Sequence, residues 1–198
     1  MKRWLLWLLV FILSLVPFFW LVYRTITDQL GANPIETLHF SLGDWALRFL
    51  CLGLMITPFK KITGFKGVMR FRRMIGLFAF FYASLHFLVY IGLDLEFSMA
   101  QFMDEVPKSP YILVGLLTYV LLIPLALTST KAMQKRLGRY WKRLHRLVYL
   151  AAVFAVVHYL WLVKLDLTEP LLYGGLVLVL FSFRVINLKQ RVNLDRAG

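Results

Sequence analysis

Two histidines, His86 and His158, each lie inside a hydrophobic stretch of about 20 residues, which is long enough to cross a lipid bilayer. An imidazole inside hydrocarbon is costly unless it has a partner, so an ionisable residue at this depth indicates a functional site. Neutral imidazole nitrogens are frequent ligands of metal ions. These two side chains are therefore the first candidates for binding a metal or a metal-containing cofactor.

The composition of the chain is that of an integral membrane protein. Of its 198 residues 60% are hydrophobic, and the mean hydropathy is +0.71. Apolar runs of about 20 residues alternate with charged segments, and none of these segments is long enough for a soluble domain. The sequence predicts an all-α protein with a single transmembrane domain over residues 1–198.

Six apolar runs are candidates for membrane spans, and they predict a six-transmembrane-helix bundle. The predicted spans cover residues 4–23, 42–59, 73–92, 110–128, 145–164 and 170–187. The first run follows Lys2 and Arg3 as a signal peptide would, but it is long for one and no small-residue cleavage site follows it. We therefore expect it to remain as the first helix.

The charged residues between the spans are sorted by sign. The segment Lys60 to Arg73 carries six bases and no acid, and Lys131 to Arg146 carries seven bases and no acid. Most acids lie in the other connections, namely Asp28, Glu36, Asp94, Glu96, Asp104, Glu105, Asp166 and Glu169. Because basic segments stay in the cytoplasm, both termini are predicted to be cytoplasmic. The basic C-terminal residues Lys189, Arg191 and Arg196 agree with this orientation.

The net charge of +13 is thus mainly a topology signal. The bases flank hydrophobic spans instead of forming one aromatic-interleaved face, which argues against nucleic acid as a partner. Anionic lipid headgroups are the expected partners of these residues. A cytoplasmic protein with an acidic surface is the alternative.

The two intramembrane histidines lie at matching depth. His86 follows Arg73, and His158 follows His145, by 13 residues, so each lies about 20 Å into its span. Alanines at the same offsets precede both histidines: Ala83 and Ala79 in one span, Ala155 and Ala151 in the other. Such small side chains can leave a slot for a flat macrocycle, or they can simply let helices pack closely with histidine as a hydrogen-bonding residue. The occurrence in two helices favours haem ligation.

The type of haem follows from what the sequence lacks. Cys51 is the only cysteine, so a C-x-x-C-H attachment site is absent and the haem would be held noncovalently, as haem b. Two imidazoles on opposite faces give a six-coordinate iron suited to electron transfer, because no position remains open for a substrate.

His145 is a further candidate ligand, for a second haem. It precedes His158 by 13 residues, but an ideal helix falls about 140° short of four full turns over that distance, so the two rings do not share a face without distortion. The complementary positions before His86 are Arg72 and Arg73. A second bis-histidine site therefore lacks its fourth histidine, and the haem number stays open between one and two.

Two other polar residues give weaker indications of function. Arg48 can pair with a haem propionate or, equally well, with Asp44 four residues earlier on the same helix face. His39 is predicted to be an exposed residue of the first outer connection without a role.

Several motifs resemble one membrane family over nearly the whole chain. They are Leu30-Gly31-Ala32-Asn33-Pro34, Ile56-Thr57-Pro58, Arg72-Arg73-Met74-Ile75-Gly76-Leu77, Leu127-Thr128-Ser129-Thr130 with Met133, Leu137 and Gly138, and Trp141…Leu144-His145…Tyr149…His158-Tyr159 with Lys164. In these motifs the chain resembles the MsrQ (YedZ) family, the haem-binding membrane subunits of periplasmic protein-methionine-sulfoxide reductase systems. It is more distantly similar to the transmembrane domain of ferric reductases and NADPH oxidases, from which it departs at Arg72 and Arg73.

The resemblance implies an electron-transfer subunit in the bacterial inner membrane, rather than the catalytic subunit of an oxidoreductase. Electrons would come from the quinone pool or a cytoplasmic flavin reductase and cross on haem b. They would reduce an MsrP-like periplasmic molybdopterin subunit that repairs methionine sulfoxide in oxidised proteins. The resemblance also implies FMN, for which no separate sequence signature is present.

Other functions make different demands on the sequence. A proton or metal transporter based on His86 and His158 would need acids inside the spans, and none lies in the middle of any predicted span. A structural anchor without a cofactor would leave both histidines unexplained. A different ferric-reductase-like electron carrier remains an alternative. No dinucleotide-binding fingerprint is present, so the chain is expected to receive electrons from a separate donor.

Overall fold

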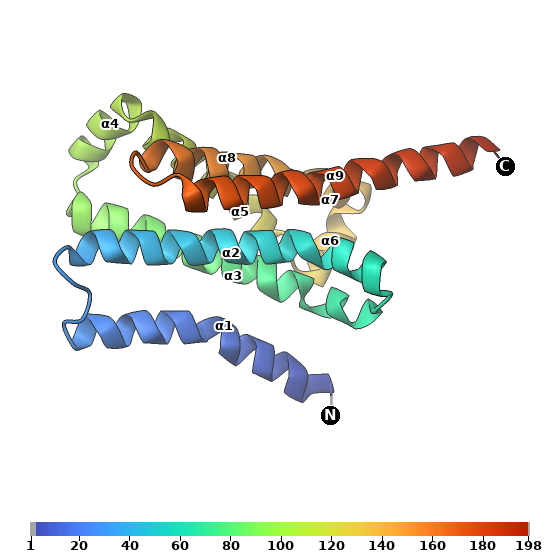
Figure 1. Ribbon diagram of the computed structural model, residues 1–198, viewed down its shortest axis with the longest axis horizontal. Helices are drawn as coiled ribbons and strands as arrows, with labels where there is room; N and C mark the ends of the chain where they lie inside the picture. Colours follow the sequence, from blue (N-terminus) through green and yellow to red (C-terminus); the bar gives the residue numbers. More distant parts are fainter. Residues whose placement is uncertain (1–2, 198) are drawn as a thin grey trace.

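The computed structural model describes residues 3–197, and among them the side chains of residues 4–184. The elements are α1 (Arg3–Ile26), α2 (Pro34–Thr63), the 3-10 helix η1 (Lys66–Phe71), α3 (Arg72–Val89), the π-helical turn η2 (Tyr90–Asp94), α4 (Met99–Lys108), α5 (Pro110–Leu127), α6 (Lys131–Leu137), α7 (Arg139–Leu144), α8 (Leu147–Leu162) and α9 (Thr168–Ala197). The long helices α1, α2, α3, α5, α8 and α9 run roughly along one direction (Figure 1). The prediction of an all-α bundle is confirmed.

Five helical stretches in the described part of the chain are long and apolar enough to cross a membrane. They are Trp4–Ile26, Pro34–Thr63, Lys66–Asp94, Pro110–Leu127 and Arg139–Leu162. Each contains or overlaps one of the first five predicted spans. The second begins eight residues earlier than predicted, because the Asn33 side chain accepts a hydrogen bond from the Glu36 backbone N–H (3.3 Å) and Pro34 occupies the first turn.

The sixth predicted span, residues 170–187, lies within α9. Side chains beyond Arg184 are outside the described residues, and so are the side chains of Lys189, Arg191 and Arg196. The sixth span and the cytoplasmic location of the termini therefore stay predictions.

The two ends of the bundle carry opposite charges. The connections that hold the acids, including α4, lie at the left in Figure 1, and the basic connections η1, α6 and α7 lie at the right. Both chain ends lie on the right, with the basic connections. This arrangement agrees with the positive-inside interpretation of the sequence.

The centre of the bundle consists of two antiparallel helix pairs. The first half-bundle is α2 with α3, and the second is α5 with α8; each pair is joined at the basic end of the molecule (Figure 1). The buried core contains Cys51 together with Ala79 and Ala151, and these small alanines suit the close packing of α3 on α2 and of α8 on α5. The two half-bundles position the histidines.

One buried tyrosine connects helix α1 to the first half-bundle by hydrogen bonds, beside ring contacts such as that between Phe11 and Phe78. Pro17 lies in the middle of α1, where its ring interrupts the backbone hydrogen bonding and bends the helix (Figure 1). At this bend the Tyr82 hydroxyl of α3 donates to the Ser14 carbonyl (2.7 Å) and accepts from the Phe18 backbone N–H (3.2 Å). Tyr82 thus bridges two groups that a regular helix would pair directly with each other.

Candidate functional site

His86 lies on α3, and a backbone carbonyl of α2 holds its ring. The Nδ1 atom lies 3.0 Å from the carbonyl oxygen of His39. Because a carbonyl oxygen only accepts, Nδ1 must carry the proton and donate. The other ring nitrogen, Nε2, therefore keeps its lone pair and is available to a metal ion.

His158 lies on α8 and is held in the same manner by α5. Its Nδ1 atom donates to the carbonyl oxygen of Tyr111 over 2.7 Å. The Nε2 atom again keeps its lone pair. Both imidazoles are thus fixed in the tautomer and orientation that a metal ligand requires, with a backbone carbonyl as the supporting partner.

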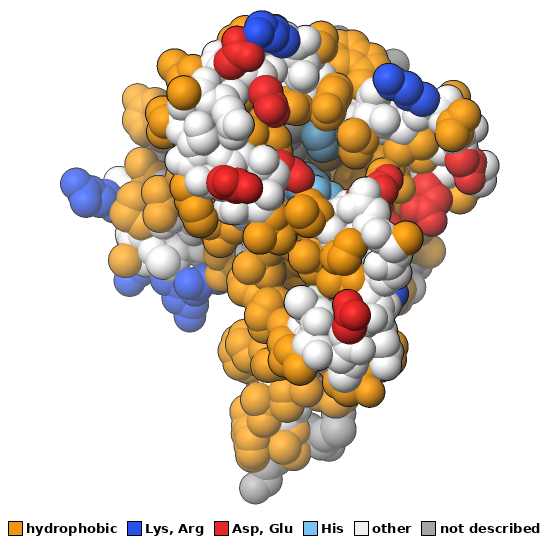
Figure 2. All heavy atoms as spheres, turned by 90° about the vertical axis from the view of Figure 1, so that its left-hand side faces the viewer, with side chains coloured by type: hydrophobic (Ala, Val, Ile, Leu, Met, Phe, Trp, Pro, Cys, Tyr) orange, Lys and Arg blue, Asp and Glu red, His pale blue; other side chains and the backbone are white. Residues whose placement is uncertain are grey.

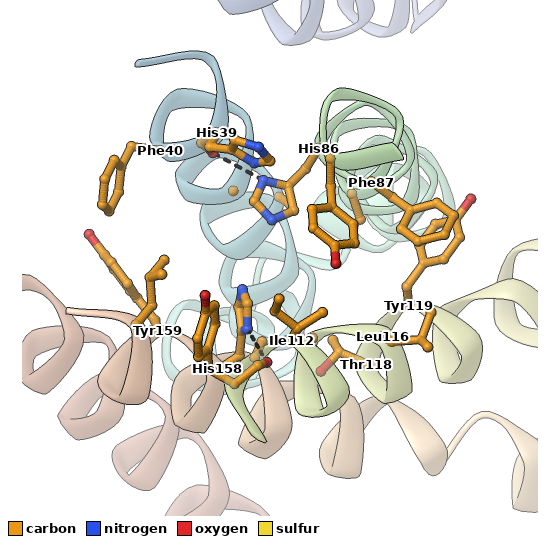
Figure 3. Close-up of a pocket in the computed structure, with 18 of the residues that line it drawn as sticks. His39, Phe40, His86, Phe87, Ile112, Leu116, Thr118, Tyr119, His158 and Tyr159 are labelled. Carbon is orange, nitrogen blue, oxygen red and sulfur yellow. Dashed lines mark hydrogen bonds between the residues drawn. The ribbon is translucent and has the colours of Figure 1, made fainter. Parts of the chain in front are cut away.

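The two rings face each other across a cavity (Figure 3). Their centres are 6.1 Å apart and their planes cross at 80°. Two metal–nitrogen bonds of about 2 Å each, with about 1 Å from each nitrogen to its ring centre, require ring centres about 6 Å apart. The spacing of His86 and His158 therefore fits a single metal ion bound between them.

A glycine on the neighbouring helix lies behind each ring. A Cβ atom at Gly43 of α2 would lie 3.3 Å from the His86 ring, and one at Gly115 of α5 would lie 2.8 Å from the His158 ring. Glycine inside a helix costs about 1 kcal/mol relative to alanine, so its presence here has a steric reason. The missing side chains let each imidazole lie directly against a helix backbone.

These contacts follow one repeat in the sequence. In both half-bundles the residue whose carbonyl accepts the hydrogen bond precedes its histidine by 47 residues: His39 precedes His86, and Tyr111 precedes His158. The second set follows the first by 72 residues, and identical residues at this offset include Gly43 and Gly115, Ala79 and Ala151, Ala83 and Ala155, and His86 and His158. The half-bundles are therefore two parallel copies of one helix pair, each supplying one histidine.

The cavity between the histidines has a volume of about 790 Å³, within the usual range for a cofactor site. Apolar side chains such as Leu47, Leu50 and Leu122 line much of it. Ala83 and Ala155 also line it, as the slot prediction requires, whereas Ala79 and Ala151 lie in the core and do not. A large, mostly apolar cavity with two opposed imidazole nitrogens fits haem b better than a bare metal ion. No group of three or more His, Cys, Asp or Glu side chains that could hold a metal ion occurs among the described residues.

The mouth of the cavity is acidic and opens at the end of the bundle that carries the acidic connections. Glu36, Asp44, Asp94 and Glu105 are among its lining residues. Figure 2 shows this end, where acidic side chains surround a hollow that contains histidine side chains. The cavity is therefore accessible from the predicted periplasmic side.

The interpretation of His39 as an exposed loop residue is wrong. His39 lies in α2, its carbonyl holds His86, and its ring packs edge-on against the His86 ring with centres 5.2 Å apart. Its Nε2 atom pairs with the Asp94 carboxylate. The error arose because α2 begins earlier than its apolar run. The sequence signal available for this region was the 72-residue offset that relates Gly43 to Gly115 and His86 to His158.

His145 lies outside this cavity, directly after α7. Its Nε2 atom is 3.0 Å from the Thr128 hydroxyl, and the Trp141 ring stacks on it with centres 4.1 Å apart. Trp141 in turn donates to the Thr128 carbonyl (2.9 Å). Ligation of iron by Nε2 would require the contact with the threonine hydroxyl to be released.

Arg48 pairs with Asp44 (3.2 Å), which was one of its two predicted partners. It also donates to the Tyr173 hydroxyl of α9 (2.9 Å). The arginine thus connects the first half-bundle to α9 near the cavity mouth.

Comparisons with known proteins identify the relatives of this chain. The family model for the ferric reductase like transmembrane component matches residues 42–156, which include His86 and His145 and end two residues before His158. A "Protein-methionine-sulfoxide reductase heme-binding subunit MsrQ" from Xanthomonas euvesicatoria pv. vesicatoria (strain 85-10) is 49% identical over 167 residues, which is 84% of this chain and 77% of that protein. A protein of the same name from Herminiimonas arsenicoxydans is 47% identical over 192 residues, 96% of this chain and 88% of the relative.

Proposed function

Because this chain belongs to the MsrQ family, within the ferric reductase like transmembrane components, we propose that it is the haem-binding electron-transfer subunit of a protein-methionine-sulfoxide reductase system. The observation that carries the proposal is the pair of opposed imidazoles, His86 and His158, with ring centres 6.1 Å apart and both Nδ1 atoms tied to backbone carbonyls. Multiple apolar helices support a multi-pass membrane protein.

In this proposal His86 and His158 would hold haem b through their Nε2 atoms. When bound, haem b takes up and releases one electron at a time at its iron. The two backbone carbonyls fix the imidazoles, so little rearrangement of ligands accompanies a change of charge at the metal. The leucines around the cavity would surround the bound group with apolar side chains. With one imidazole from each half-bundle bound to its iron, the group would serve electron transfer and not substrate binding.

The haem proposal is tested by absorption spectra of the purified protein in mild detergent, oxidised and after reduction with dithionite. We expect a low-spin b-type spectrum. A pyridine-haemochrome count near one haem per chain supports the His86 and His158 site alone, and a count near two supports His145 as a ligand of a second haem. Haem-free protein from haem-replete cells would contradict the proposal.

We further propose that electrons enter from the quinone pool or a cytoplasmic flavin reductase and pass to an MsrP-like molybdopterin subunit in the periplasm. In this proposal the protein lies in the bacterial inner membrane. The basic segment Lys131 to Arg146 would be the docking surface of a cytoplasmic donor. Reversing its charge should slow reduction from the cytoplasmic side, and an unchanged rate would exclude that role. Binding of FMN is implied by the family resemblance alone, and no residue is assigned to it.

The acidic mouth is the proposed delivery surface, and its partner should present a basic face. Charge complementarity of this kind raises association rates by about 10- to 1,000-fold and weakens as salt is added. Glu36→Gln with Glu105→Gln should therefore slow reduction of the periplasmic subunit and flatten its salt dependence. Asp28→Asn is the matched control, because this acid lies at the same end of the bundle but does not line the cavity. Equal rates in both variants would exclude the mouth as the docking surface.

A further inference from the structure

Helix α4 carries two exposed methionines, Met99 and Met103. Their side chains are 69% and 67% exposed. Because they lie four residues apart on one helix, they share one face of α4. The other methionines among the described residues are buried or half-buried: Met55, Met69, Met74 and Met133. The accessible thioether groups of the described chain are therefore concentrated on this one helix.

Helix α4 lies outside the candidate membrane spans. The third span ends at Asp94 and the fourth begins at Pro110, and α4 lies between them at the acidic end of the bundle (Figure 1). Asp104, which directly follows Met103, pairs with Lys108 on the same helix, and both side chains of this ion pair are exposed. An exposed ion pair beside Met103 indicates that α4 is in contact with water, so oxidants dissolved in water reach its methionines.

Another side of α4 borders the cavity. Phe102 and Glu105 are among the residues that line it. The Tyr90 hydroxyl donates to the Glu105 carboxylate (3.3 Å), and the rings of Tyr90 and Phe102 have centres 6.5 Å apart. Helix α4 therefore covers part of the acidic mouth with one side and presents Met99 and Met103 on another.

Oxidation of a methionine requires access to its sulfur atom but no catalytic group. In the net reaction with hypochlorous acid the sulfur gains one oxygen and loses two electrons, and chloride and a proton are released. The product, methionine sulfoxide, is polar, whereas the original side chain is apolar. Reduction of the sulfoxide takes up two electrons and two protons and releases water. Met99 and Met103 meet the requirement for access, and the buried Met74 does not.

We propose that Met99 and Met103 form a reversible oxidation site on the periplasmic face of the protein, and that the catalytic subunit of the methionine-sulfoxide reductase system repairs it. The repair step rests on the proposed function, whereas the oxidation step does not depend on haem. The chain thus carries a substrate of the system that it supplies with electrons. Because α4 borders the acidic mouth, a catalytic subunit that docks there reaches the helix that holds both methionines.

Oxidation is tested by peptide mass spectrometry of the full chain in phosphatidylcholine nanodiscs, after graded exposure to hypochlorous acid. Each sulfoxide adds about 16 Da, the mass of one oxygen. We expect Met99 and Met103 to be oxidised at least about tenfold faster than Met74, because exposure controls access to the sulfur. The matched variant is Met99→Leu with Met103→Leu, which keeps the apolar volume without a sulfur atom. It should gain no oxygen on α4 and keep its haem spectrum.

Repair is tested separately, with the oxidised chain as the substrate of a periplasmic methionine-sulfoxide reductase catalytic subunit. Reduced benzyl viologen supplies electrons directly to that subunit, so the haem of this chain is bypassed. A failure of the proposed electron transfer therefore does not affect the result. We expect the oxygens added at Met99 and Met103 to be removed.

Two results would overturn the proposal. Oxidation of Met99 and Met103 no faster than that of Met74 would show that lipid or protein covers this face of α4. Sulfoxides that persist at Met99 and Met103, while the same catalytic subunit reduces free methionine sulfoxide, would show that the site is not repaired by this system.

Discussion

The two half-bundles are alike around the cavity and different near the basic end of the molecule. Around the cavity, His86 with the His39 carbonyl and Gly43 is repeated by His158 with the Tyr111 carbonyl and Gly115. Near the basic end, the residue 72 positions before His145 is Arg73. Arg73 is exposed, whereas His145 is partly buried against Thr128 and Trp141.

This difference indicates what each layer can bind. A metal ion between two parallel repeats takes one equivalent ligand from each, and His86 and His158, which we call the outer layer, supply this pair. His145 and Arg73, which we call the inner layer, offer one histidine and one arginine, so any haem there has at most one histidine ligand from these two positions. The repeat therefore predicts that a haem in the outer layer has two equivalent histidine ligands, whereas a haem in the inner layer would lack the second one.

The largest expected effect is the loss of haem when either outer ligand is removed. Because the half-bundles are equivalent around the cavity, His86→Ala and His158→Ala should abolish the outer haem to the same extent. The measurement is the haem count per purified chain with the reduced absorption spectrum. A variant that keeps its full haem spectrum would remove that histidine from the ligand assignment.

Substitution of the two glycines should affect the two half-bundles to different extents. A Cβ atom at Gly115 would lie 2.8 Å from the His158 ring, so Gly115→Ala must move the ring or the helix at a cost of about 1–3 kcal/mol. At Gly43 the distance to His86 is 3.3 Å, and the higher helix propensity of alanine, about 1 kcal/mol, offsets much of the strain. Gly115→Ala should therefore lower haem content and thermal stability more than Gly43→Ala. The reverse order would contradict the cavity geometry.

Tyr82 marks a difference between the halves that does not involve the haem. The residue 72 positions later is Phe154, which lacks the hydroxyl group that Tyr82 uses to hold α1. Tyr82→Phe leaves the Ser14 carbonyl and Phe18 N–H without this bridge, so we expect a loss of about 1–2 kcal/mol in unfolding free energy. Thermal or denaturant unfolding measures this loss. An accompanying loss of haem would mean that α1 also shapes the cavity.

The smallest expected effect is that of His145→Ala. The change removes a hydrogen bond with Thr128 and the stacking of Trp141, and should cost about 1 kcal/mol of stability. Because His145 does not line the cavity, the spectrum of the outer haem should persist. If two haems are present, the count should fall by one. Loss of all haem would show that the two layers are not independent.

The sequence predicted those features that depend on one helix at a time. The first five spans, the opposite charges of the two ends and the equal depth of His86 and His158 follow from hydropathy and from the rise per residue of a helix. The bend of α1 also depends on one helix alone, because Pro17 removes a backbone hydrogen bond inside it.

Contacts between helices could be predicted less well from the sequence. The role of the His39 carbonyl depends on a partner 47 residues away, and hydropathy gave no indication that α2 begins at Pro34. Gly43 and Gly115 were not identified, because a glycine in an apolar run has several possible functions until the neighbouring ring is known. For Arg48 the structure shows the pair with Asp44 and a contact with Tyr173, which lies 125 residues away in the sequence, and the pairing with a haem propionate stays a prediction.

The most direct test of one shared iron between the half-bundles is electron paramagnetic resonance of the oxidised protein at low temperature. The imidazole planes cross at 80°, and nearly perpendicular axial imidazoles give a highly anisotropic low-spin ferric signal instead of an ordinary rhombic one. We expect this signal in the purified chain and its loss in both His86→Ala and His158→Ala. A high-spin signal in the unaltered protein, or a low-spin signal that survives either substitution, would contradict the account.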